Sequence, residues 1–137
     1  MAQANKLAVE DVQRSAAAML GSYEDADAVL SAMRSAGLIG EQEYFQTKIG
    51  YLQDEAKIRI QALKDENTLL ASQAQGKAKS LEAERQIAKN RAEIARIEQQ
   101  TLTKTTVLTV EAAAKRNQEA QAVEEQGAKL RSQKKSK

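Results

Sequence analysis

The sequence predicts an all-α protein in which an N-terminal helical hairpin is followed by a long helix with a coiled-coil pattern. Three observations predict this fold class. The 137 residues include no proline, apolar side chains recur every three or four residues over most of the chain, and long segments are rich in Ala, Lys, Glu and Gln. Proline is the strongest helix breaker, and an apolar period of three to four residues places the apolar side chains on one face of a helix.

Composition weighs against an enzyme and against a large globular core. The chain contains no cysteine and no histidine, so it lacks thiolate ligands, disulfides and the commonest metal ligand and general base. Its four aromatic residues all lie in the first half, which places any compact core near the N-terminus. They are Tyr23, Tyr44, Phe45 and Tyr51. We therefore expect no enzymatic activity and no cofactor.

Charge is distributed unevenly along the chain. Residues 1–70 carry seven basic and eleven acidic side chains, whereas residues 71–137 carry fourteen basic and eight acidic ones. The last nine residues contain five basic groups and no acid. Such an end can meet phosphate or an acidic partner, but a solvated, frayed end is the simpler interpretation. The start of the chain lacks the apolar core of a signal peptide, and no apolar run approaches the roughly 20 residues of a membrane span.

Two short helices are expected before the first strong turn signal. Apolar residues at helical spacing predict one helix over residues 7–20, which Gly21 would end. Ser22 would then cap a second helix, whose inner face includes Leu30 and Met33 and which ends at Gly37.

The octapeptide at residues 37–44 predicts an elbow between two helices. Gly37 suits the left-handed conformation that ends a helix, and Gly40 suits the cap of the next one, with Glu43 where a capping-box carboxylate would sit. Leu38 and Ile39 are expected to be buried in the turn. The carboxylates of Glu41 and Glu43 suit the positive end of the helix dipole. Tyr44 or Phe45 would pack back across the elbow, and these residues together form the predicted structural elbow.

A seam of apolar residues at coiled-coil spacing follows the elbow. It weakens near Gly76 and then resumes, and it is the face through which we expect homo-oligomers to form. The seam residues are Ile49, Leu52, Ala56, Ile60, Leu63, Asn67, Leu70, Ile87, Asn90, Ile94 and Ile97. The two seam asparagines have two equal interpretations: polar groups that set register and oligomeric state, or ordinary breaks in a loose stripe.

The segment at residues 101–110 is the one β-prone stretch, because it is rich in Thr and Val. It is compatible with a strand, a loop or strained helix, and helical neighbours on both sides favour helix. The Glu111-Ala-Ala-Ala-Lys115 sequence after it is a strong helix former. We therefore divide the chain into residues 1–40 with short helices and the elbow, 41–100 with a long coiled-coil helix, 101–128 with the Thr/Val-rich stretch and a helical segment, and 129–137 as a basic flexible tail.

One unbroken helix from Glu41 to about Glu125 would be about 130 Å long at about 1.5 Å per residue. A helix with a single apolar stripe is not stable alone at that length. It needs a partner chain or must fold back on itself near Gly76.

No constellation of residues predicts chemistry. The carboxylate pairs are on charged helix surfaces, where nothing apolar shifts a pKa, and no phosphate loop, EF-hand loop or nucleophile motif is present. The basic residues of the second half alternate with glutamates, and no aromatic residue there could stack on a base. We therefore do not expect direct binding of nucleic acid.

Read with its flanks, the elbow segment at residues 30–52 resembles a helical hairpin of bacteriophage tail tape-measure proteins. The shared pattern is a leucine-containing helix, Gly37-Leu38-Ile39, a small cap, acidic residues, an aromatic residue and then Lys48. The resemblance covers roughly residues 25–100, and Gly40 departs from the usual Ser or Thr cap. Tape-measure proteins are much longer, so the resemblance implies a segment or a reduced relative.

The resemblance implies a structural rod that sets tail length, occupies the lumen of the tail tube, and contacts tail-tube or tail-assembly proteins. It would then be located in the virion, and in the host cytoplasm during assembly. The alternative is a cellular, cytoplasmic coiled-coil adaptor or protein-interaction module whose elbow docks a partner. Both interpretations make the protein structural and non-catalytic.

Overall fold

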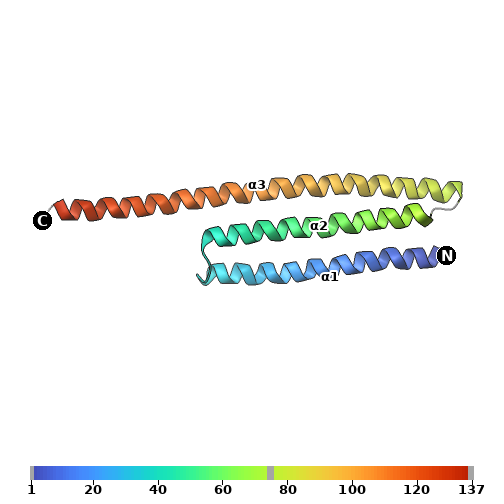
Figure 1. Ribbon diagram of the computed structural model, residues 1–137, viewed down its shortest axis with the longest axis horizontal. Coiled ribbons are helices and arrows are strands. Elements are labelled where there is room, and N and C mark those ends of the chain that lie inside the picture. Colours follow the sequence, from blue (N-terminus) through green and yellow to red (C-terminus); the bar gives the residue numbers. More distant parts are fainter. Residues whose placement is uncertain (1, 74–75, 136–137) are drawn as a thin grey trace.

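The computed structural model describes residues 2–73 and 76–135, which form three helices (Figure 1). They are α1 (Ala2–Ser35), α2 (Glu41–Gln73) and α3 (Lys77–Lys135). The described residues contain no strand, so the predicted all-α class is confirmed.

The three helices lie side by side with α2 in the middle (Figure 1). α2 packs against α1 on one side and against α3 on the other, and in the described part of the chain the backbones of α1 and α3 do not approach each other closely. Consecutive helices run in opposite directions, because each connection reverses the chain. The fold is therefore a layer of three antiparallel helices, and α2 must present two contact faces.

The interior of this layer consists mainly of small side chains. Leu30 and Phe45 are the largest buried apolar residues, with 6% and 3% of their surface exposed, and both lie beside the elbow. The remaining buried apolar residues are Ala16, Ala56, Ala83, Ile97 and Ala112. Alanine at a helix contact lets two backbones approach closely, but each alanine buries little apolar surface. The aromatic packing is thus concentrated at the elbow end of α1 and α2, as the distribution of aromatic residues predicts.

α1 is one continuous helix, so the predicted break at Gly21 is wrong. Gly21 lies in the helix interior, and Ser22 does not cap a new helix, because its hydroxyl donates to the carbonyl of Ala18 at 3.3 Å. A glycine in a helix interior costs only about 1 kcal/mol relative to alanine. Contacts of the following turn with α2 offset this cost, among them the edge-to-face contact of Tyr23 with Tyr51.

The chain reverses a second time before Gly76, whose φ of +82° is in the left-handed region. The prediction of one helix over residues 41–100 is therefore wrong. So long a helix was expected either to need a partner chain or to fold back on itself near Gly76, and the chain folds back. Gly76 also provides the carbonyl that accepts the first helical hydrogen bond of α3, from the amide of Ser80 at 2.9 Å.

α3 is continuous across residues 100–101 and 128–129, where the sequence predicted boundaries between segments. Residues 101–110 are helical, as their helical neighbours favoured, and the hydroxyls of Thr103, Thr105 and Thr109 donate to carbonyls three or four residues earlier. These bonds satisfy the threonine side chains within the helix. The helix then continues to Lys135, so residues 129–135 of the predicted tail are helical, and residues 136–137 lie outside the described residues.

α3 is much longer than the other helices and extends past the elbow (Figure 1). At about 1.5 Å per residue, its 59 residues measure about 90 Å, against about 50 Å for α2. Ala112 is its last buried residue, and in residues 113–133 every side chain is exposed, with only Gly127 half-buried. We call residues 113–135 the projecting segment.

Replacing Gly37 by valine should destabilise the protein. Gly37 has φ +73°, and a Cβ there would meet no atom within 4 Å, so the cost comes from the backbone alone. We expect a loss of about 1–2 kcal/mol in the free energy of unfolding, measured by urea titration followed by circular dichroism. Gly37→Asn, which tolerates this conformation better, is the control and should lose less. Equal stability of Gly37→Val and the wild type would contradict the left-handed cap.

Replacing Gly21 by alanine should have the opposite effect. Because Gly21 lies within α1 and a Cβ there meets nothing within 4 Å, alanine should stabilise the helix by up to about 1 kcal/mol. The same titration measures it. A clear loss of stability would mean that Gly21 ends a helix after all.

Candidate functional site

The elbow is built on a hydrogen-bonding pattern that ends α1. The amide of Leu38 donates to the carbonyl of Met33 at 2.9 Å, and the amide of Gly37 donates to the carbonyl of Arg34 at 3.1 Å. These two bonds, with the positive φ of Gly37, form a Schellman motif. The predicted C-cap is therefore confirmed.

Two details of the predicted elbow are wrong and one is right. Leu38 is 73% exposed rather than buried, whereas Ile39 is half-buried. Glu43 forms no capping box and is exposed. Gly40 does cap α2, since its carbonyl accepts from the amide of Tyr44 at 3.0 Å.

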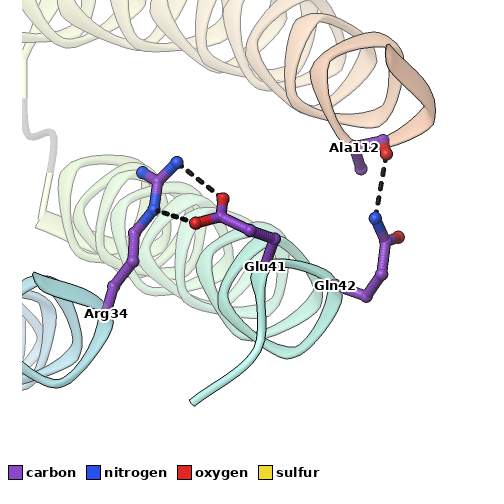
Figure 2. A network of polar contacts seen from close by, with 4 residues as sticks. All are labelled: Arg34, Glu41, Gln42 and Ala112. Carbon is purple, nitrogen blue, oxygen red and sulfur yellow. Dashed lines mark hydrogen bonds and ion pairs between the residues drawn. The ribbon is translucent and has the colours of Figure 1, made fainter. Parts of the chain in front are cut away.

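Arg34 connects the two sides of the elbow (Figure 2). Its Nη2 and Nε donate to the two carboxylate oxygens of Glu41 at 2.8 and 3.2 Å. Its guanidinium also lies over the rings of Tyr44 and Phe45, 4.1 and 5.3 Å from their centroids. A paired guanidinium stacked on aromatic rings is a geometry that lysine cannot reproduce. Arg34 therefore holds the last turn of α1 against the first turn of α2.

The Arg34–Glu41 pair shifts both pKa values in the direction that keeps the pair charged. The hydrogen bonds from Arg34 lower the pKa of Glu41, and its positive charge and that of Lys115 on α3 lower it further. The hydrogen bond to Glu41 likewise raises the pKa of Arg34. Both side chains are about one-third exposed, so solvent screens the pair.

Gln42 ties α3 to the elbow (Figure 2). Its Nε2 donates to the backbone carbonyl of Ala112 at 2.9 Å, and its Oε1 accepts from Nη2 of Arg116 at 3.0 Å. Both partners are about 70 residues away in the chain. Gln42 therefore marks the point at which α3 leaves the layer and begins to project.

Further polar contacts set the register of α1 against α2. Nζ of Lys48 lies 2.6 Å from Oδ1 of Asp27, and the Tyr23 hydroxyl donates to Asp54 at 3.1 Å. The hydrogen bond to the Asp54 carboxylate is the main reason that the pKa of Tyr23 is raised. These contacts, like Arg34 with Glu41, pair later residues of α1 with earlier residues of α2, which is the order of an antiparallel pair.

The two seam asparagines contact each other between α2 and α3. Nδ2 of Asn90 donates to Oδ1 of Asn67 at 2.8 Å, and Oδ1 of Asn90 accepts from Nε2 of Gln86 at 2.9 Å. Asn90 is only 4% exposed. Because a buried amide is satisfied in only a few relative positions of two helices, this pair favours the register-setting interpretation.

The predicted seam residues are all buried or half-buried. The Asn67–Asn90 contact places this seam between two helices of one chain. Association of separate chains through the seam remains a prediction. Sequence reasoning missed the second face of α2, which packs on α1, although Tyr51 and Ile58 lie off the seam and are both half-buried.

An open groove of about 860 Å³ lies between the first half of α1 and the second half of α2. Its apolar surface includes Val12, Ala16 and Met19 of α1 and Ile58 and Ala62 of α2. Charged side chains of both signs border it, from Asp11, Lys57, Lys64, Asp65 and Glu98.

The described residues include no group of three or more Asp, Glu, His or Cys side chains placed to hold a metal ion. No helix in the described part of the chain has the length and hydropathy to cross a membrane. No protein-family model, curated protein or solved structure matches this chain. The functional argument therefore depends on the helices and their exposed surfaces.

The Asn67–Asn90 pair should fix the register of α3 against α2. Asn90→Ala leaves the Asn67 amide without its partner, and we expect a loss of about 1–3 kcal/mol in the free energy of unfolding. Replacing both asparagines by leucine should restore stability, because no polar group is then left unpaired. Urea titrations of the two variants and the wild type test this. If the double variant were less stable than Asn90→Ala, the account would be wrong.

The elbow ion pair should make stability fall in acid. Because the pKa of Glu41 is lowered in the folded state, its contribution is present above the ordinary carboxyl pKa of 4.5 and is lost as pH falls through the lowered value. Melting temperatures measured across this pH range should fall less steeply in Glu41→Gln than in the wild type. Glu43→Gln, which changes an exposed neighbour, is the control and should keep the wild-type slope.

Proposed function

We propose that this chain is a non-catalytic structural protein that works as a helical interaction module. In this proposal α1 and α2 brace the first part of α3 and hold its projecting segment out for a partner. The observation that carries it is the burial pattern of α3, which is packed as far as Ala112 and exposed beyond it.

The physics of helices supports a partner for the projecting segment. An isolated helix of about 20 residues is marginal in water unless its apolar face is covered. Val123 and Leu130 of this segment are 71% and 58% exposed. Their spacing of seven residues, and the spacing of eleven residues from Ala112 to Val123, place them on the side of α3 that faces α2 earlier in the chain. The partner would cover this face of α3 beyond the elbow, as α2 covers it in the earlier part of the helix.

The charge of the projecting segment indicates the chemistry of that partner. Lys129 and Arg131 flank Leu130, and the last nine residues carry five basic groups and no acid. An amphipathic helix with an apolar stripe and acidic borders complements this surface. We therefore propose an acidic helical segment of another protein as the partner, in the cytoplasm if the chain is a cellular adaptor.

A tail tape-measure role is the second proposal, and the length of α3 favours it. A helix converts residue number into distance at a fixed rise, and 59 residues in one helix give about 90 Å. Folding back to form α2 uses 33 residues without adding length, which is why we rank this role second. In this case the partners would be tail-tube or tail-assembly proteins in the tail lumen.

Site-specific photo-crosslinking tests the interaction module. A photoreactive amino acid at Glu119 or Gln126, which are exposed and lie on the same face of the projecting segment as Val123, should crosslink a partner in cells that express the chain naturally. The same group at Gln13 or Gln46, both exposed on α1 and α2, is the matched control and should capture much less. Equal capture from all four positions would contradict the proposal.

Mass spectrometry of purified virions and of isolated tails tests the second role. Peptides from α1, α2 and α3 should all be recovered from tails at a fixed ratio to the tube protein. Their absence from tails of a phage that encodes the chain would contradict a place in the tail lumen.

A further inference from the structure

α3 carries an apolar stripe on the side that faces away from α2. Three of its members are large apolar residues that remain strongly exposed: Leu102 at 61%, Val107 at 49% and Val110 at 63%. Thr103, Thr106 and Ala114 complete the stripe, and all are exposed. We call these six residues the outer stripe. They follow helical spacing, so they form one continuous surface about three turns long.

The charged residues of this part of α3 avoid the outer stripe. Between residues 99 and 118 the charged side chains are Lys104, Glu111, Lys115 and Arg116. Arg116 reaches back to Gln42 of α2, and Lys115 is close enough to lower the pKa of Glu41. Lys104 and Glu111 are seven residues apart and so lie on the same border of the stripe.

This distribution of charged and apolar side chains is the reverse of that on an ordinary surface helix. The exposed face of a helix normally carries the charges, and the apolar residues face the core. Here the charges lie toward α2 or at the border, and the uncharged face meets solvent. Contiguous exposed apolar surface of this kind marks an interaction site.

We propose that the outer stripe is the interface of a homodimer in which two α3 helices pack antiparallel. The occupant is a second copy because the border of the stripe is self-complementary. A two-fold axis between Val107 and Val110 places Val107 against the partner subunit's Val110. It also brings Lys104 beside the partner subunit's Glu111, and the reverse pair forms on the other side of the axis.

A parallel pair would lose these contacts. The two-fold axis of a parallel pair runs along the helices, so the charged borders of the two stripes lie on opposite flanks of the contact, and Lys104 does not meet the partner subunit's Glu111. In the antiparallel pair, Thr103 faces the partner subunit's Ala114, and these small side chains let the helices approach closely.

The fold leaves room for this dimer. α1 and α2 both lie on one side of α3 (Figure 1), and helical spacing places the outer stripe on the other side. The two three-helix layers therefore stay on the outside, and the two projecting segments point in opposite directions. The contact is only about three turns long, well below the size of obligate interfaces, so we expect a reversible dimer with a dissociation constant in the micromolar range. This inference goes beyond the interaction module, since it requires no other protein.

Sedimentation velocity over a concentration series tests the dimer with the full chain. The wild type should shift from monomer to dimer, and Val110→Glu should weaken dimerisation by at least about tenfold, because it buries a charge at the axis. Val29→Glu is the matched control, since Val29 is 58% exposed on α1 and should leave the dimer unchanged. Helical circular dichroism checks that both variants fold. A wild type that stays monomeric, or a Val29→Glu chain that loses the dimer equally, overturns the proposal.

Charge reversal tests the pairing. Lys104→Glu alone and Glu111→Lys alone should each weaken the dimer, because each creates two like-charge contacts across the axis. The double variant should recover at least most of the wild-type affinity. Failure of the double variant to recover would overturn this register.

Spin labels test the orientation. The chain has no cysteine, so Gln100→Cys or Thr109→Cys gives a single labelling site. The antiparallel dimer places the two labels about 25 Å apart along the axis at position 100, and close together at position 109. Short distances at both positions would mean a parallel pair and would overturn the proposal. None of these readouts depends on a crosslinked partner, so the dimer and the interaction module can fail separately.

Discussion

The need to cover α2 on both sides governs this structure. A helix of 33 residues with apolar side chains at two opposite faces is not stable in water by itself, because its gain per residue in an isolated helix is too small. α1 covers one face and α3 covers the other, and both do so because the chain reverses at Gly37 and again before Gly76. Loss of either chain reversal would leave one face of α2 exposed to water. The layer therefore depends on two short connections more than on a large core.

Since four of the seven fully buried apolar residues are alanines, apolar packing alone specifies the register weakly. Sliding one Ala-rich face past another by a turn would bury a similar area. Polar contacts remove this freedom. Asn67 with Asn90 sets α3 against α2, while Arg34 with Glu41 and Lys48 with Asp27 set α1 against α2. The asparagine pair is the more deeply buried of these contacts, so a wrong register there leaves unpaired amides without water.

Two of the uncovered surfaces are on α3, and they differ in character. The projecting segment has apolar residues on the face that continues the α2 contact; Lys129 and Arg131 flank Leu130, whereas Glu124 and Glu125 follow Val123. The outer stripe lies on the other face and is uncharged. Because one helix carries both, binding at the outer stripe would orient the projecting segments of two chains relative to each other.

Local rules were enough to determine the helical class, the C-cap at Gly37 and the seam, because each depends on neighbours within a few residues. The same rules failed at Gly21, where tertiary packing on α2 compensates a helix-weakening residue. They also could not tell a partner chain from a fold-back, because a seam has the same spacing in both cases. Leu38 was expected in the interior, but it is 73% exposed. Only the tertiary structure decided that Asn67 meets Asn90, that Gln42 holds Ala112, and which face of α3 remains in solvent. These contacts join residues 23 and 70 positions apart, a distance over which local sequence carries no information.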